Sequence, residues 1–197
     1  MTKLIFCYSW VYDQSIYSWL GKEWKDKYIK EGRKYAREIQ KWWNRINDKV
    51  FVALRAFGFK LPSIWRAYPV TCKEITPFSD PLTIKISYDW NHVFTTIIHE
   101  LAHIAFSLPE NKKLKDKTFK YIKKTFPKEK PQTRAHIPII LLQLSVMAKV
   151  FPKKYQKMLV KQKSFSSLKR AWKIIEKNKN KIDISKPIES ILNLNRG

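Results

Sequence analysis

Residues 93–108 are almost free of charge in a chain where charged residues make up 28% of the sequence. The one exception is the carboxylate of Glu100. Wound as an α-helix over residues 91–108, the segment gathers apolar side chains on one face: Val93, Phe94, Ile97, Leu101, Ile104, Ala105 and Leu108. The segment therefore predicts a helix buried along one side, around which the rest of the domain must pack.

The other face of this helix carries His99 and His103 in a His-Glu-x-x-His pattern. Residues four apart lie one turn apart on the same face, so both imidazoles can reach one metal ion. Glu100 lies on the flank of that face, where it can take a proton from a metal-bound water instead of binding the metal. The alternative, two histidines that merely share a face, is disfavoured because the neighbouring positions on this face are mostly small or hydroxyl-bearing. The spacing predicts a zinc site with its general base beside it.

Residues 96–105, Thr-Ile-Ile-His-Glu-Leu-Ala-His-Ile-Ala, resemble the extended signature of the zincin metallopeptidases. In that signature a Val or Thr opens the segment, uncharged residues fill the gaps and an apolar residue closes it. The resemblance implies Zn²⁺ as the cofactor, His99 and His103 as metal ligands, Glu100 as the general base, and hydrolysis of peptide bonds.

The subgroup of zincins stays open. The metzincin pattern continues with a Gly three residues and a His six residues after the second His, where this chain has Phe106 and Pro109. Thermolysin-like gluzincins take a Glu from a downstream Asn-Glu-x-x-x-Asp segment, which this chain lacks. The sequence therefore fits neither subgroup.

A catalytic zinc normally has three protein ligands and one position for water, so a third ligand is required. His136 precedes the apolar run 137–148, which predicts a buried helix with Pro138 in its first turn. We expect His136 to be the third metal ligand, with Glu129 or Glu110 as the alternatives.

His92 is the remaining histidine. It stands two turns before His99, ~10.5 Å along the helix, which is too far to share the metal easily. We therefore expect His92 to line the cleft or to cap the helix.

The rest of the sequence predicts an α+β, zincin-like domain that is mostly helical, with a small mixed sheet above the metal-binding helix. Helices are expected over residues 14–30, 32–57, 111–126, 155–163, 167–177 and 184–192. Strands are expected over residues 64–72 and 82–88, with a turn at 77–81 between them. The alternating strand 82–88 is the expected sheet edge beside the cleft, where an extended substrate could pair with it.

We expect residues 1–151 to form the metallopeptidase domain. Residues 152–197 would be a lysine-rich helical extension that packs on the same domain or covers the cleft. The formal net charge of +24 has two interpretations. It indicates nucleic acid or an anionic membrane as a partner, or it reflects a thermophile-like composition, because the lysines are spread along the entire chain.

Cys7 and Cys72 are far apart and predict neither a structural zinc site nor a disulfide framework. The N-terminus makes a poor signal peptide, and the longest apolar run is too short to span a bilayer. The sequence therefore predicts a soluble, cytoplasmic protein with no membrane span, whose oligomeric state stays open.

The expected function is zinc-dependent hydrolysis of a peptide or protein substrate, with His99, His103 and His136 as ligands and Glu100 activating the attacking water. Two alternatives remain. One is a nucleic-acid-associated protease that uses the basic surface, and the other is a catalytically silent zinc-binding module.

Overall fold

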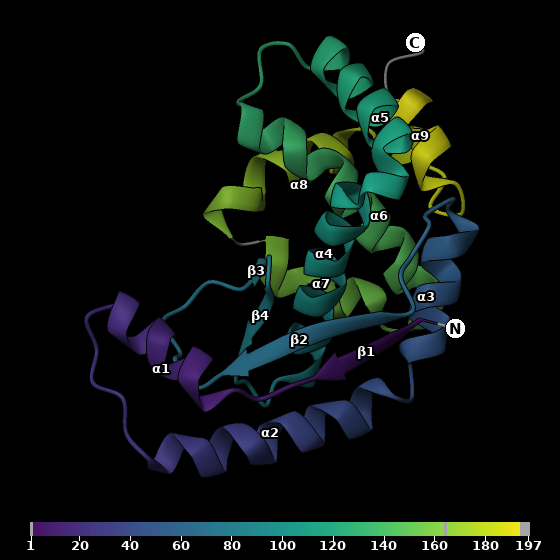
Figure 1. Cartoon of the computed structure of the whole chain (residues 1–197). Helices are drawn as coiled ribbons and strands as arrows, with labels where there is room; N and C mark the ends of the chain where they lie inside the picture. The colour runs from purple at the N-terminus through teal and green to yellow at the C-terminus, as the bar shows by residue number, and fades with distance from the viewer. Residues whose placement is uncertain (1, 164, 194–197) are drawn as a thin grey trace.

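The computed structural model describes residues 2–163 and 165–193, and one small mixed sheet packs against helices in it (Figure 1). The strands are β1 (Lys3–Phe6), β2 (Ile64–Val70), β3 (Phe78–Ser79) and β4 (Leu82–Lys85), in the order β1-β2-β4-β3. β2 runs parallel to both β1 and β4, with Lys3 opposite Ile64 and Tyr68 opposite Thr83. β3 runs antiparallel to β4. The predicted α+β class with a small mixed sheet is confirmed.

The edge of the sheet differs from the prediction. β4 lies between β2 and β3, so the expectation that residues 82–88 form the edge strand is wrong at Leu82 and Thr83, which pair with β3. The outermost strand is β3, which falls inside the predicted turn 77–81, and it leaves Ile84 and Lys85 uncovered on that side within the described residues. Two residues are too few to show an alternating pattern, which is why periodicity does not reveal this strand.

The opposite edge, β1, is closed by side-chain amides. The backbone N–H groups of Leu4 and Phe6 donate to the side-chain oxygens of Asn47 (3.1 Å) and Gln40 (2.9 Å). The amide nitrogens of the same two side chains donate to the carbonyls of Thr2 (2.9 Å) and Leu4 (3.1 Å). These amides occupy the place of a further strand and leave little backbone for another chain to pair with.

The N-terminal helices are α1 (Trp10–Trp19), α2 (Lys27–Trp43) and α3 (Asn47–Ala56). The predicted helices over 14–30 and 32–57 are therefore wrong in their bounds. α1 ends before Gly21, whose φ of 66° lies in the left-handed region that favours glycine. The break between α2 and α3 escaped prediction because the apolar period runs through it, from Trp43 to Val50.

The helix α4 (Trp90–Ser107) lies at the centre of the molecule, between the sheet and α6 (Pro131–Val150). The predicted helix over residues 91–108 thus forms almost as expected. Its apolar stripe is buried, with Ile97 and Leu101 fully inaccessible. The main core joins this stripe to the strands and to α2, α3 and α6.

α6 begins earlier than predicted. It starts at Pro131, so Pro138 lies inside the helix and not in its first turn. Because Pro138 has no N–H, the carbonyl of Arg134 loses its helical partner there. Because the helix starts at Pro131, His136 lies within it, one turn after Gln132. Nδ1 of His136 is 2.8 Å from the carbonyl oxygen of Gln132.

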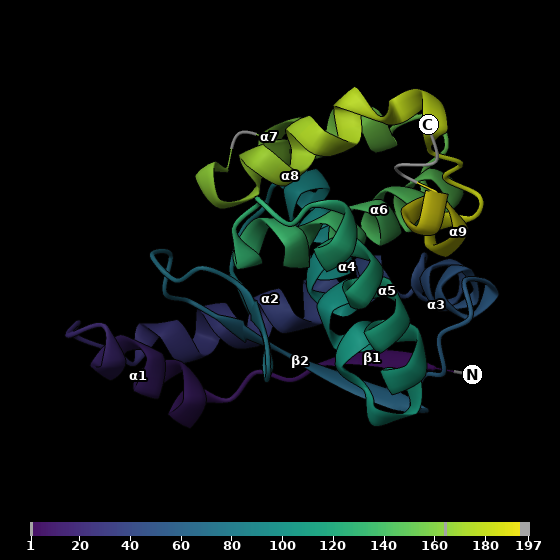
Figure 2. The same ribbon diagram turned by 90° about the horizontal axis from the view of Figure 1, so that it is seen from above.

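The remaining helices cover α4 and α6. They are α5 (Lys112–Thr125), α7 (Tyr155–Lys163), α8 (Ser166–Lys177) and α9 (Pro187–Asn193). A second core forms between α5, α6, α7, α8 and α9, and α7 also packs on α4. Seen from above, α7 and α8 lie on the side of α4 and α6 that is away from β1 and β2 (Figure 2). None of the helices in the described ranges is long and apolar enough to cross a membrane.

Candidate metal centre

The two motif histidines lie on the side of α4 that faces α6. Asp89 caps the start of this helix by accepting from the backbone N–H of His92 (3.2 Å). His99 follows His92 by seven residues and is 6% exposed. His103, one turn after His99, is half-buried. Their Nε2 atoms are 3.3 Å apart, so both ring nitrogens meet at one point.

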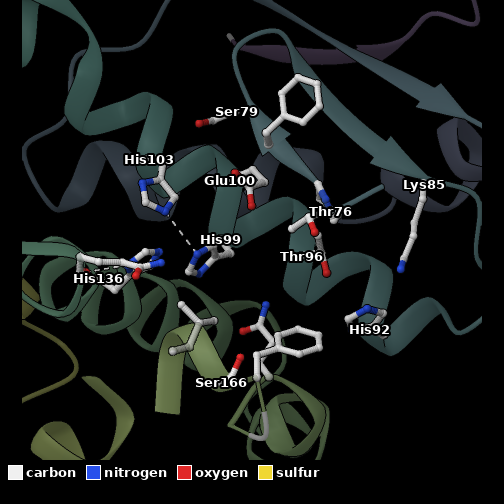
Figure 3. Close-up of a pocket in the computed structure, with 16 residues that line it drawn as sticks. Thr76, Ser79, Lys85, His92, Thr96, His99, Glu100, His103, His136 and Ser166 are labelled. Carbon is white, nitrogen blue, oxygen red and sulfur yellow. Dashed lines mark hydrogen bonds between the residues drawn. The ribbon is translucent and has the colours of Figure 1, made fainter. Parts of the chain in front are cut away.

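His136 of α6 joins them from across the fold (Figure 3). Its ring centroid is 5.7 Å from that of His99 and 5.2 Å from that of His103. One nitrogen from each of the three imidazoles lies within 4.8 Å of the other two. Ligand nitrogens at about 2.1 Å from a zinc ion are about 3.4 Å apart in a tetrahedral arrangement, so small side-chain rotations suffice to close the site. The structure therefore brings all three predicted ligands together within reach of one metal ion.

The two alternative ligands lie elsewhere. The carboxylate of Glu129 accepts from the Nε atom of Arg170 at 3.0 Å and lines a different cavity beside α8. Glu110 is an exposed residue of the short 3₁₀ helix Pro109–Asn111. Neither belongs to the cluster of potential ligands formed by the three histidines.

Gln143 of α6 holds the ring of His99 in place. The side-chain oxygen of this fully buried residue is 3.1 Å from Nδ1 of His99. Its amide nitrogen donates to the carbonyl of Thr95 (2.8 Å), which can only accept, and to the side-chain oxygen of Gln162 (2.6 Å). The oxygen of Gln143 must therefore accept the proton of His99 Nδ1, which leaves the lone pair of Nε2 for a metal ion.

Sequence reasoning missed Gln143, although a signal was present. It is a polar interruption of the apolar run 137–148, and a buried amide needs partners for its polar atoms. Gln162 of α7 could not be found in this way, because only the fold places α7 against α4.

Burial sets the protonation of His99 and His103. It lowers the pKa of His99 to about 3, with a further contribution from the nearby His103. It also lowers the pKa of His103 to about 4, with His136 adding to the shift. Both imidazoles are therefore neutral at neutral pH, which is the form that binds metal ions.

Glu100 is buried beside this cluster. It is 9% exposed, and burial raises the pKa of its carboxyl group to about 8. A carboxyl group with a pKa near the working pH can both accept and release a proton, as a general base and acid must. A nearby cation would favour its ionised form.

The three histidines and Glu100 line a cavity of about 510 Å³ (Figure 3). One wall comes from residues 76–79, around β3, and from Lys85 of β4. A second wall comes from Gln162, Phe165, Ser166 and Leu168 of the α7–α8 region. His92 lines the same cavity but does not belong to the three-histidine cluster. The C-terminal segment therefore forms part of the candidate site.

Comparisons of the chain with protein-family models, with curated proteins and with solved structures found no match.

Proposed function

We propose that the chain is a zinc metallopeptidase of the zincin type. The observation that carries this proposal is the convergence of three imidazoles from α4 and α6 next to a buried glutamate. Three nitrogen ligands with a fourth side open to a cavity match the donor set and open position of catalytic zinc sites. The same motif in the sequence resembles the zincin signature.

Each residue has a defined task in the proposed reaction. His99, His103 and His136 would hold Zn²⁺, with Gln143 fixing the ring of His99. When bound, the ion supplies Lewis-acid activation of water and of the substrate carbonyl. Glu100 takes the proton from the attacking water and delivers it to the leaving amine.

The sheet beside the cavity supports a peptide as the substrate. β3 pairs with β4 only at Leu82 and Thr83, whereas Ile84 and Lys85 pair with β2 on their other side. The cavity-facing side of β3 and of these two residues has no further strand within the described residues. An extended peptide can add to such an edge through its backbone.

The test is a comparison of parent, Glu100→Ala and His99→Ala proteins for zinc content and for digestion of a peptide library. Glu100→Ala should retain zinc, because its carboxylate is not a ligand, while hydrolysis falls by ~10²-fold or more. His99→Ala should lose zinc.

Equal loss of zinc in both variants would contradict the assigned roles. Undiminished hydrolysis by Glu100→Ala would contradict the mechanism. A parent protein that binds zinc but hydrolyses no peptide would be the catalytically silent zinc module.

A further inference from the structure

The charges that line the cavity are unevenly placed. Glu100 lies at the end with the three histidines, and Lys85 is the one lysine or arginine among the described residues that line the cavity. Figure 3 shows the Lys85 side chain extending toward His92, on the far side of the cavity from His136. Thr76, Ser79, Thr96 and Gln132, which also line the cavity, are polar but uncharged. Lys85 is therefore the cation that the described lining residues present at this end of the cleft.

The ammonium group of Lys85 is available to a ligand. It donates to the carbonyl of Lys73 at 3.2 Å, which uses one of its three hydrogens. Lys85 takes part in none of the ion pairs formed among the described residues. Lys85 is half-buried as a residue, and its side chain lies on the wall of the cavity, where its ammonium group can donate charge-assisted hydrogen bonds to a carboxylate.

The spacing between Lys85 and the histidines limits which carboxylate can reach it. His92, which lies beside Lys85 in the cavity, precedes His99 by seven residues, or ~10.5 Å of helix. An extended peptide advances about 3.3 Å per residue, so this distance corresponds to about three residues of substrate.

We propose that Lys85 forms a carboxylate-binding subsite. It selects peptides that carry an acidic side chain, or a free C-terminal carboxylate, about three residues from the bond that is cleaved. This inference rests on the proposed peptidase function and adds the class of substrate.

The experiment uses the zinc-loaded protein and peptides that differ only by Glu or Gln at the second, third and fourth positions on either side of a cleaved bond. Each peptide is supplied as the free acid and as the C-terminal amide, which separates a side-chain carboxylate from a terminal one. We expect kcat/KM to be about tenfold higher when a carboxylate is present at the matching distance.

The variant Lys85→Glu should reverse this preference, and Lys85→Gln should abolish it. Lys49→Glu is the matched control, because Lys49 is exposed on α3, does not line the cavity, and gives the same change in net charge. Circular dichroism and zinc content would establish that each variant is folded and loaded.

Equal responses of Lys85→Glu and Lys49→Glu would overturn the subsite, because both would then act through net charge alone. A parent protein that cleaves peptides with no preference for a carboxylate would also overturn it. A parent that cleaves no peptide refutes the proposed function instead.

The subsite is then judged by fluorescence anisotropy with the same peptides, labelled, on zinc-loaded Glu100→Ala protein. Weaker binding of the carboxylate peptides when Glu100→Ala is combined with Lys85→Glu, but not when it is combined with Lys49→Glu, supports the subsite. No difference between the two overturns it.

Discussion

Asp13 and His99 are both buried polar residues on helices, yet their surroundings differ. The carboxylate of Asp13 accepts from the backbone N–H and the hydroxyl of Thr71 (2.9 and 2.8 Å) and from the hydroxyl of Tyr8 (2.9 Å). All of these partners belong to the protein, and they join α1 to the residue that follows β2. His99 meets Gln143 at one ring nitrogen, whereas its other ring nitrogen lies 3.3 Å from that of His103, a second potential metal ligand on the wall of the cavity.

The difference separates a structural cluster from a binding cluster. Buried polar groups cost free energy unless hydrogen bonds replace the water that they lose. Around Asp13 the fold provides those bonds. Around His99 the fold brings three imidazoles together and leaves nitrogen lone pairs directed at one point, an arrangement that a metal ion can satisfy. Substitutions in the two clusters should therefore change different quantities.

The largest effect is expected at the binding cluster, His99, His103 and His136. His136→Ala should lower zinc affinity by more than about 100-fold, because it removes a ligand, and a change behind a ligand already costs about 10–100-fold. His92→Ala, on the same cavity but outside the cluster, is the control and should change affinity little. Competition with a chromogenic zinc chelator measures both. Similar affinities for the two variants would mean that His136 is not a ligand.

Gln143 shares a property with each cluster. It is fully buried, as Asp13 is, and it contacts His99, a proposed zinc ligand. Gln143→Leu should lower zinc affinity by about 10–100-fold, since His99 loses the acceptor that fixes its tautomer. Ser145→Ala is the matched control: Ser145 is a buried polar residue of the same helix, and its hydroxyl donates to the Leu141 carbonyl (2.9 Å). If both variants bind zinc alike, Gln143 has no role in positioning His99.

In the structural cluster around Asp13, a substitution should change the stability of the fold and not the zinc affinity. Asp13→Ala should lower the free energy of unfolding by about 1–3 kcal/mol, because Thr71 and Tyr8 lose a charged acceptor in a buried site. Zinc affinity should not change. Urea denaturation of the metal-free protein measures the stability, and Asp116→Ala, at an exposed aspartate of α5, is the control. A fall in zinc affinity as large as that of Gln143→Leu would show that the two clusters are coupled.

The features that the sequence predicted well are those that depend on a single helix. The spacing of His99 and His103 and the apolar stripe of α4 are properties of a single 18-residue helix, and the structure forms that helix. His136 was inferred because a third ligand was needed and the other remaining histidine, His92, is too far along the helix from His99. The sequence did not locate the start of its helix, since Pro131 and Pro138 are both compatible with a first turn.

The rest depends on contacts between distant elements. Gln162 reaches Gln143 only because α7 folds back on α4. β3 forms only because the backbone of Phe78 and Ser79 pairs with β4. The break between α2 and α3 is another such case. The side chain of Asn47, the first residue of α3, bonds to the backbone of β1, 43 residues earlier in the chain. No periodicity within residues 32–57 encodes that contact.

The closed edge at β1 also has a consequence for the order of folding. As the chain leaves the ribosome, β1 appears first, but its strand partner β2 follows only after α1, α2 and α3 have been made. Parallel pairing over such a separation is slow compared with helix formation. Gln40 and Asn47 emerge before β2 does, and their amides can bond to β1 as soon as α2 and α3 form. We therefore expect β1 to dock first on these helices, which shields its backbone from neighbouring nascent chains until β2 completes the sheet.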